Sequence, residues 1–246
     1  MSEQERTIDV AFLPSEVRAA ELAVVVDVLR ASTTMASALA AGYSRILCVE
    51  DADHAKELRE DGRVLAGERD CQPIPGFDFG NSPGGLGDGE GRELVLSTSN
   101  GSPAILKAAA EADEVLVGSL VNLDAILEAI PSQADLTVVC CGTNGRVALE
   151  DLYTAGRIVA KLAGQRSDAA RAVERVAGGY EKAYDALAES ADAAVLRETD
   201  QADDIGYCAQ ESVIELVPRV SDVTSDVATV SDGQSVDNHN PDGGRR

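Results

Sequence analysis

Short apolar runs rich in β-branched residues alternate with Ala-rich stretches, and this alternation constrains the fold more than any other feature of the chain. The runs predict strands at residues 7–12, 22–28, 45–50, 63–67, 93–98, 114–119, 136–141 and 213–218. Two of them, AVVV and TVVCC, carry no polar face, which is typical of strands that are buried on both sides of a sheet. The pattern therefore predicts a three-layer α/β/α fold around a mostly parallel or mixed sheet.

The segments between these runs have the composition of crossover helices. We predict helices at residues 33–41, 51–61, 102–112, 121–130, 148–164, 168–190 and near 200–210. Residues 1–218 then form one α/β domain, with room for two subdomains. Beyond residue 218, Ser-Asp pairs recur without an apolar face, so we expect residues 219–246 to be an acidic, disordered tail.

The charge balance excludes several classes of partner. The chain has 43 acidic and 21 basic side chains, which gives a formal charge of −22. Nucleic acids and anionic membranes are bound by basic patches, and none is visible, so neither is expected as a partner. An acidic, Lys-poor and aromatic-poor composition is typical of proteins that fold in concentrated salt, where ions screen the self-repulsion. We therefore expect the protein of a halophile.

Targeting signals and metal-type cysteine patterns are not recognisable. The first twenty residues lack the pattern of a signal peptide and no apolar run approaches ~18 residues, so we expect a cytoplasmic protein. Five cysteines without paired spacing argue against a disulfide framework or a structural zinc site. His54 lies in a charged helical stretch and His239 in the polar tail, which leaves little room for histidine catalysis.

The segment VVVDVLRASTT (residues 24–34) places polar groups where a buried strand ends and a helix begins. Asp27 ends the strand and Arg30 follows it, while Ser32, Thr33 and Thr34 open the helix. An acid, a guanidinium group and hydroxyls at a helix N-terminus can together bind a phosphate and a divalent cation. Alternatively, Asp27 pairs with Arg30 and Ser32 caps the helix. We favour the binding site, because an acid at the end of so apolar a strand is unfavourable to bury without a role.

A second turn from a strand into a helix is LSTSNGSPA (residues 96–104). Backbone N–H groups around Gly101 and the hydroxyls of Thr98 and Ser102 are suited to hold anionic oxygens. The segment lacks the Walker spacing and any Lys, which argues against a nucleotide P-loop. A similar pattern, GTNGRVA, recurs at residues 142–148. Both turns follow the carboxyl ends of strands, the edge at which open α/β sheets bind ligands.

The segment VVCCGTNGRVALEDLYTAG (residues 138–156) allows two mechanisms. Cys140 and Arg146 have the spacing with which a thiolate and an Arg enclose phosphate in cysteine-dependent phosphatases. Glu150 and Asp151 instead offer carboxylates to Mg²⁺. An apolar strand end raises the pKa of a thiol, and Val147 stands where those phosphatases have Ser or Thr, so we favour a structural role for Cys140.

Two further segments carry candidate groups. A long Gly- and Pro-rich loop spans residues 67–92, and loops of this length are usually functional or disordered. Its polar candidates are Glu68, Arg69, Asp78, Asn81 and Ser82. In ADDIGYCAQ (residues 202–210), Asp203 and Asp204 are either a helix cap with a first-turn acid or metal carboxylates, and we favour a cap for at least one of them.

Together these segments resemble the 2-phosphosulfolactate phosphatase family of coenzyme M biosynthesis. The resemblance spans roughly residues 8 to 218 and rests on five ordered blocks: VVVDVLRASTT, GERDCQPIPGFDFGNSP, LVLSTSNGSPA, CGTNGRVALEDLYTAG and DDIGYCAQ. It implies Mg²⁺-dependent hydrolysis of 2-phospho-3-sulfolactate to 3-sulfolactate and phosphate. The chain departs from the family pattern in its Ser-Thr-Ser-Asn-Gly turn and at Val147, which leaves the substrate open.

An anionic, phosphorylated small substrate must meet local positive charge on so acidic a protein, and Mg²⁺ together with a few Arg side chains supplies it. We predict Asp27 and Glu68 as metal ligands, and Asp27, Glu150 and Asp151 as catalytic acids. The predicted substrate-binding residues are Arg30, Ser32, Thr33, Arg69, Asn81, Ser82, Thr98, Asn100, Gly101 and Arg146.

Two alternatives remain at this point. One is a phosphatase that uses the Cys140 thiolate, and the other is a non-catalytic α/β protein that binds small anions. We favour the metal-dependent enzyme, because a simple anion-binding protein has no need for several acids beside its anion-binding turns. A homo-oligomer is compatible with the sequence, since the predicted helix at residues 168–190 can pack within one chain or between two.

Overall fold

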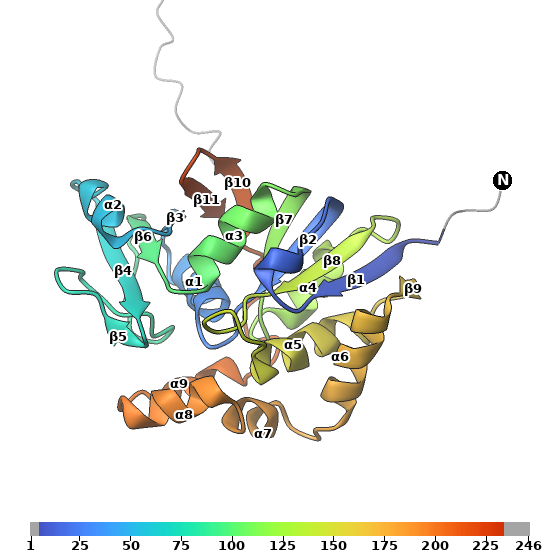
Figure 1. Cartoon of the computed structure of the whole chain (residues 1–246). Coiled ribbons are helices and arrows are strands. Elements are labelled where there is room, and N and C mark those ends of the chain that lie inside the picture. The colour runs from blue at the N-terminus through green and yellow to red at the C-terminus, as the bar shows by residue number, and fades with distance from the viewer. Residues whose placement is uncertain (1–4, 234–246) are drawn as a thin grey trace, which may run out of the picture.

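Eleven strands join in one mixed sheet in the computed structural model, which describes residues 5–233 (Figure 1). Their order across the sheet is β5-β4-β6-β3-β11-β10-β7-β2-β8-β1-β9. The strands are β1 (Thr7–Ala11), β2 (Ala20–Val26), β3 (Arg45–Val49), β4 (Arg63–Arg69), β5 (Gln72–Pro73), β6 (Glu93–Ser97), β7 (Ala112–Gly118), β8 (Leu136–Cys140), β9 (Gln165–Arg166), β10 (Arg219–Val223) and β11 (Val227–Ser231).

Two parallel groups of strands make up most of the sheet. Strands β4, β6 and β3 pair in parallel with one another, and so do β7, β2, β8 and β1. All side chains of residues 22–26 in β2 are buried, as expected for a strand without a polar face. The predicted α/β class with a mostly parallel or mixed sheet is confirmed.

The hairpin of β10 and β11 lies in the middle of the sheet and joins the two parallel groups. β11 pairs antiparallel with β3, and β10 pairs antiparallel with β7. The prediction of a disordered tail from residue 219 onward is therefore wrong for residues 219–231. The side chains of Ala228 and Val230 are fully buried, so this short polar segment owes its structure to tertiary packing. Residues 234–246 of the predicted tail lie outside the described residues.

Helices cover both faces of the sheet and complete the three layers (Figure 1). On one face, α1 (Ala31–Ala40) and α3 (Gly101–Ala109) contact strands of both parallel groups. Nine of the ten residues of α1 are buried, and their mostly small side chains allow this close packing. The opposite face is covered by α2 (Ala52–Glu57), α4 (Leu123–Ala129), α5 (Leu149–Val159) and α6 (Asp168–Gly178).

Three further helices form a separate layer below the sheet edge in Figure 1. They are α7 (Ala183–Ala188), α8 (Ala191–Glu198) and α9 (Asp203–Cys208). Their apolar side chains pack around Tyr153 of α5 and the segment that follows β2. The single helix predicted at residues 168–190 is wrong, because α6 ends at Gly178 and α7 begins only at Ala183. The strand predicted at residues 213–218 is also wrong, since no strand is assigned there and β10 begins at Arg219.

The remaining expectations about the chain concern cysteines and membranes. All five cysteines are free thiols, as the spacing predicted. Within residues 5–233, no helix has the length and hydrophobicity needed to cross a lipid bilayer.

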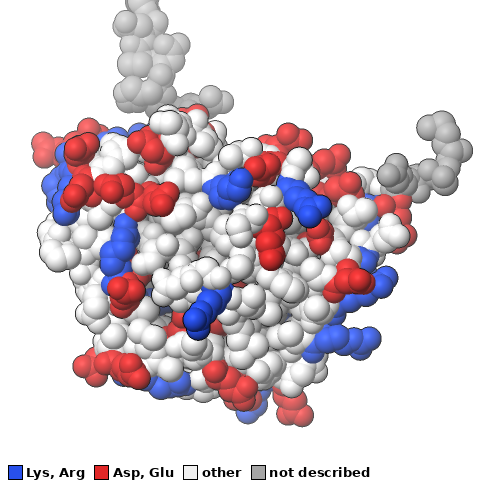
Figure 2. All heavy atoms as spheres, in the orientation of Figure 1, with Lys and Arg blue, Asp and Glu red and all other residues white. Residues whose placement is uncertain are grey.

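On the face drawn in Figure 2, acidic side chains are scattered over many elements and interspersed with basic ones, so no single patch on this face holds the excess charge.

Candidate active site

A cavity of about 140 Å³ lies where the carboxyl ends of β2, β4, β6 and β8 meet α8. Its walls combine acidic, amide and apolar side chains with one buried Arg. The lining residues are Asp27, Leu29, Arg30, Glu68, Asp70, Cys71, Asn81, Ser99, Asn100, Thr143, Asn144, Asp192 and Val195. The structure thus brings Asp27, Arg30, Glu68, Asn81 and Asn100 of the predicted site to one cavity, at the strand edge that the sequence indicated.

Asp27 lies between the first turns of two helices. Its Oδ1 atom accepts a hydrogen bond from the Ala31 N–H of α1 at 3.1 Å, and its own N–H donates to Ser32 Oγ at 2.7 Å. On the other side, a Cβ atom on Gly101 would stand 2.7 Å from Asp27 Oδ2. Only a glycine therefore allows α3 to begin this close to the carboxylate. Gly101, predicted to bind anionic oxygens through backbone N–H groups, does not line the cavity, and what the structure shows is that it makes room for Asp27.

Several carboxylates crowd this region. Burial raises the pKa of Asp27 well above its ordinary value, and the nearby charges of Asp151, Asp192 and Glu68 raise it further. Burial likewise raises the pKa of Asp192. A group of hard oxygen donors with unfavourable mutual repulsion suits a divalent cation such as Mg²⁺, which uses one or two carboxylates and keeps several waters. Within the described part of the chain, no three acidic, His or Cys side chains already converge on one point.

Glu68 organises two loops at the cavity wall. Its Oε1 accepts from the Ser99 N–H at 2.8 Å, and its Oε2 accepts from the Cys71 N–H at 2.9 Å. Asp70 and Cys71 both have positive φ angles, 51° and 60°, which non-glycine residues rarely adopt. Oε2 also accepts from Ser99 Oγ at 3.3 Å, so Oε1 is the Glu68 oxygen that keeps a second lone pair. The residue therefore fits a ligand role as well as the loop-ordering role that its contacts show.

Arg30 is 2 % exposed and forms an ion pair with Asp204 of α9, with 2.5 Å between Nη1 and Oδ2. Its Nη2 atom has no hydrogen-bond partner, and neither has Oδ1 of the buried Asn81. Both residues line the cavity. Arg30 does not form the alternative ion pair with Asp27, because the carboxylate paired with Arg30 is that of Asp204. A buried donor and a buried acceptor thus remain available to a ligand.

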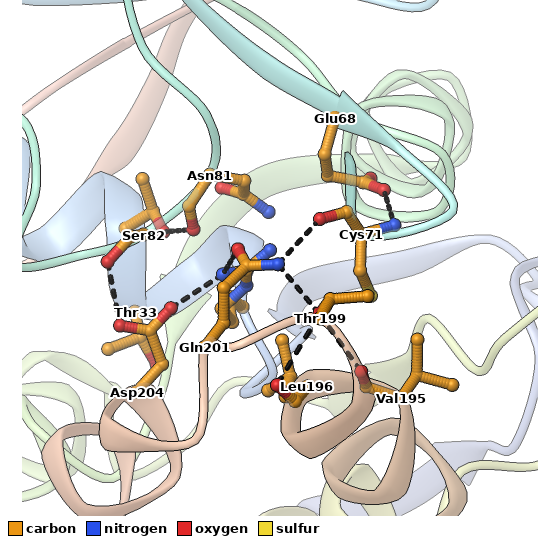
Figure 3. Close-up of polar contacts among 12 residues, drawn as sticks. Thr33, Glu68, Cys71, Asn81, Ser82, Val195, Leu196, Thr199, Gln201 and Asp204 are labelled. Atoms are coloured by element: carbon orange, nitrogen blue, oxygen red, sulfur yellow. Dashed lines mark hydrogen bonds and ion pairs between the residues drawn. The ribbon is translucent and has the colours of Figure 1, made fainter. Parts of the chain in front are cut away.

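The favoured cap role of Asp203 or Asp204 is wrong. The residue at the N-cap of α9 is Ala202, and no side chain caps this helix. Asp204 instead faces inward, where it holds Arg30 and accepts a hydrogen bond from Ser82 Oγ at 2.7 Å (Figure 3). Ser82, which was predicted to bind substrate, therefore contacts Asp204 and does not itself line the cavity.

Glu150 and Asp151 lie in the first turn of α5, behind the cavity. Asp151 accepts from the N–H groups of Val28 at 3.0 Å and Gly142 at 2.9 Å, and burial raises its pKa to about 7. Burial and the neighbouring acids Asp151 and Asp192 raise the pKa of Glu150 to about 9. Neither residue lines the small cavity. Glu150, whose Oε2 atom has no partner, faces an adjoining groove of about 620 Å³.

Several predicted hydroxyl groups are turned away from the cavity. Thr33 Oγ1 donates to the Val28 carbonyl at 2.8 Å, and Ser32 Oγ bonds the Asp27 N–H. The hydroxyls of Thr98 and Ser102 bond each other and the backbone of their own turn. None of these four residues lines the cavity, so their contacts are those of structural turns.

Two predicted Arg residues lie at neighbouring surfaces. Arg69 donates to the carbonyl oxygens of Glu50, Glu68 and Ser97, and it lines a broad groove of about 870 Å³ beside the cavity. Arg146 is exposed and lines the groove that Glu150 faces. Neither guanidinium group lies in the cavity wall with Arg30.

Cys140 does not face the cavity. Its side chain is fully buried among apolar residues of the sheet and of α5 and α6. Burial raises the pKa of the thiol well above its ordinary value, and the charges of Asp151 and Glu150 raise it further. A buried, protonated thiol is a poor nucleophile. The structural role that the sequence favoured agrees with this position.

Sequence reasoning missed three residues that build the site, Asp192, Asn144 and Gln201, and it considered Asp204 only as a helix cap or a metal ligand. Asp192 lines the cavity and accepts from Thr143 Oγ1 at 2.5 Å, and the Asn144 N–H donates to Asn100 Oδ1 at 3.2 Å. Gln201 and Asp204 hold Arg30. Asp204 lies in the quoted DDIGYCAQ block, and Asn144 lies in the repeated Asn-Gly turn, so both had a signal. Asp192 lies in ordinary helical sequence and Gln201 in the short connection between α8 and α9, and neither segment gives a local sign of its role.

The sequence is similar to one protein family and to several known proteins. The family described as 2-phosphosulpholactate phosphatase matches residues 10–223. A probable 2-phosphosulfolactate phosphatase of Thermotoga petrophila is 35% identical over 215 residues, which cover 86% of this chain and 94% of that protein. The 2-phosphosulfolactate phosphatase of Methanothermobacter thermautotrophicus is 36% identical over 198 residues, 80% of this chain and 85% of that one. A probable 2-phosphosulfolactate phosphatase of Deinococcus radiodurans is 37% identical over 209 residues, covering 80% and 87% of the two chains.

Proposed function

Since this chain belongs to the 2-phosphosulfolactate phosphatase family, we propose that it hydrolyses 2-phospho-3-sulfolactate to 3-sulfolactate and inorganic phosphate. The observation that carries the proposal is the Nη2 atom of Arg30, which is buried, lacks a partner and belongs to a residue of the cavity wall. A guanidinium donor in this position suits an anionic oxygen. The small volume of the cavity, about 140 Å³, favours a small ester over a polymeric substrate.

The acidic groups of the cavity support a divalent cation, and we propose Mg²⁺. Asp27 is the first expected ligand, and Glu68, across the same cavity, is the second. Bound there, Mg²⁺ would neutralise negative charge on the phosphoryl oxygens and would favour deprotonation of the attacking water. Its charge would also relieve the repulsion that raises the pKa of Asp27.

The residues of the chain itself have separable tasks in this proposal. Arg30 binds the phosphoryl group or another acidic group of the substrate, and Asn81 offers a hydrogen-bond acceptor beside it. Asn100 and Ser99 line the wall at the start of α3. Leu29 and Val195 supply apolar surface, which lowers the local dielectric constant and strengthens the electrostatic contacts.

Hydrolysis also requires a group that accepts the proton of the attacking water. The candidates are the three predicted catalytic acids, of which only Asp27 lines the cavity. Asp151 accepts two backbone N–H groups behind it, and Glu150 lies beyond Asp151 toward the groove. Asp27 is therefore the acid best placed to act directly, and we propose supporting roles for Asp151 and Glu150.

The test is a hydrolysis assay in which the purified protein is incubated with 2-phosphosulfolactate and Mg²⁺. The release of inorganic phosphate is measured over time. We expect turnover that a chelator abolishes and that added Mg²⁺ restores. Asp27→Asn should lower kcat/KM at least 100-fold, because it removes both the charge and the expected ligand. Asp113 is an exposed carboxylate on β7, so Asp113→Asn is the matched control and should keep full activity. Full activity of Asp27→Asn would remove this residue from the mechanism.

The same assay decides between the alternatives. Iodoacetamide should leave turnover unchanged, because Cys140 is buried with a raised pKa, and burial raises the pKa of Cys71, the thiol of the cavity wall, to about 11. Loss of activity with the alkylating reagent but not with the chelator, also in a Cys71→Ser variant, would favour the thiolate mechanism. Calorimetric binding of 3-sulfolactate without phosphate release from the ester would instead favour a non-catalytic anion-binding protein.

A further inference from the structure

The segment that joins α8 to α9, residues 199–202, and the first turn of α9 contact distant parts of the cavity wall (Figure 3). Gln201 is central to these contacts. Its Nε2 donates to the carbonyl of Cys71 at 2.8 Å and to Thr199 Oγ1 at 2.8 Å, while its Oε1 accepts from Arg30 Nη1 at 2.5 Å. One side chain of this segment therefore joins the turn after β4 to the turn after β2.

Asp204 makes the second set of contacts. Its Oδ2 accepts from Arg30 Nη1, and its Oδ1 accepts from Ser82 Oγ, at 2.5 Å and 2.7 Å. The carboxylate thus joins Arg30 to Ser82 in the Gly- and Pro-rich loop of residues 67–92. Both oxygens of Asp204 are occupied by protein donors, so this residue has the contacts of a positioning group.

These contacts are uneven across the guanidinium group of Arg30. Nη1 donates to both Gln201 and Asp204, whereas Nη2 has no partner and is buried. Leaving a buried charged donor without a partner is unfavourable, because it has lost its water without gaining another acceptor. If the ion pair only stabilised the fold, the orientation of Arg30 that leaves Nη2 without a partner would have no explanation. An anionic ligand oxygen in the cavity would satisfy the free donor.

We propose that Asp204 and Gln201 are positioning residues, which fix Nη1 of Arg30 so that Nη2 is aimed at an anionic oxygen of the substrate. The inference rests on the proposed phosphatase function and adds to it a source of substrate affinity outside the cavity wall. The helical layer of α8 and α9 then contributes to the site in two ways. It supplies Asp192 directly, and it orients Arg30 through residues 201 and 204.

The proposal predicts a specific kinetic signature. Asp204→Asn keeps the shape of the side chain but weakens the bond that orients Arg30. We expect it to raise both KM for 2-phosphosulfolactate and the calorimetric Kd for inorganic phosphate, with Mg²⁺ present, by about 10- to 100-fold, the range for a lost hydrogen bond to a charged group. kcat should change less than about threefold, because binding of substrate and transition state is weakened alike.

Gln201→Met is the second variant, because it removes no charge and keeps the length of the side chain. It should raise the same two constants in the same direction, by a smaller factor than Asp204→Asn, since Asp204 still holds Nη1. Asp203→Asn is the matched control: Asp203 is the exposed neighbour of Asp204 in the same turn of α9, and its replacement should leave KM and Kd unchanged.

The outcomes separate a positioning role from a structural one. If Asp204→Asn and Gln201→Met lower the melting temperature or the active fraction but leave KM and the phosphate Kd at wild-type values, the inference is wrong. Failure of the wild-type protein to bind phosphate would also overturn it. If the wild type binds phosphate with this dependence on residues 201 and 204 but does not hydrolyse the ester, the positioning inference stands and the proposed function fails.

Discussion

Gly101 leaves no room for a side chain beside Asp27. A methyl group there would stand 2.4 Å from Ala31 Cβ as well as 2.7 Å from Asp27 Oδ2. We predict that Gly101→Ala lowers the free energy of unfolding by about 1–3 kcal/mol, as overpacking does, and lowers kcat/KM because Asp27 must move. Urea unfolding and the hydrolysis assay measure both effects.

Gly178→Ala provides the control for this substitution. Gly178 ends α6, and a Cβ atom there would have no neighbour within 4 Å. Its replacement should therefore leave activity unchanged and stability equal or slightly higher, because Ala favours the helix. Equal stability and activity of the two variants would contradict the close packing of α3 against Asp27.

Glu150 gives a pH dependence whose sign follows from its pKa. The pKa is about 9 in the folded chain, above the ordinary value of 4.5, so the folded state holds a proton that the unfolded state loses. The stabilisation is complete below about pH 4.5 and is lost as the pH rises toward 9. In chelator, the free energy of unfolding should fall between pH 5 and pH 8 by about 1 kcal/mol per pH unit more in the wild type than in Glu150→Gln.

Chemical denaturation across this pH range measures the effect. Glu57→Gln, an exposed residue of α2, is the control and should follow the wild-type curve. If the curves of the wild type and Glu150→Gln run parallel, Glu150 does not hold a proton in the folded state.

Local sequence predicted some residues of the site and not others, for a physical reason. Asp27 and Arg30 interrupt an otherwise apolar strand end, which is a local anomaly that burial makes unfavourable without a role. Asp192 and Asp204 lie on helices where an acid is ordinary, and they acquire their roles only through contacts with Thr143 and Arg30. Such contacts span 49 and 174 positions of the chain, so no pattern within a single segment reports them.

At the scale of elements, the hairpin of β10 and β11 is where prediction and structure differ most. The alternation in VATVS, residues 227–231, is short and lies among Ser-Asp pairs, and the prediction of a disordered tail took no account of it. Each strand of the hairpin finds its partner in a strand that lies more than a hundred residues earlier in the chain. Strands β2, β6 and β8 were predictable, because their apolar runs are long enough to be buried in any arrangement.

The central position of the hairpin predicts an asymmetry between two of its valines. Val230 is fully buried in the core that contains α1 and α3, whereas Val223 is 43 % exposed. We expect Val230→Ala to lower the free energy of unfolding by about 2 kcal/mol or more, because it leaves a cavity in the core. Val223→Ala should change it by less than about 0.5 kcal/mol. Equal, small effects in urea unfolding would show that the hairpin contributes little to the fold.

At the scale of the whole molecule, the negative net charge repels the anionic substrate that the site is proposed to bind. A charge of −22 repels a phosphorylated acid at long range, yet the proposed substrate must enter a cavity whose wall contains several carboxylates. Salt reduces the long-range part of this repulsion, since the Debye length falls from about 10 Å at 0.1 M to about 3 Å at 1 M. The buried Arg30 and the proposed Mg²⁺ act within contact distance, where salt screens much less.

The scattered surface charge predicts that folding itself depends on salt. With a net charge of −22, acidic side chains such as those interspersed over the face in Figure 2 repel one another, and this repulsion destabilises the compact state in dilute buffer. We expect the melting temperature to rise between 0.05 and 1 M KCl and to level off once the Debye length is shorter than the spacing between charges. NaCl should act almost equally, because screening depends on ionic strength, and sucrose of equal osmolality should not reproduce the rise. A melting temperature that stays constant over this range would rule out adaptation to concentrated salt.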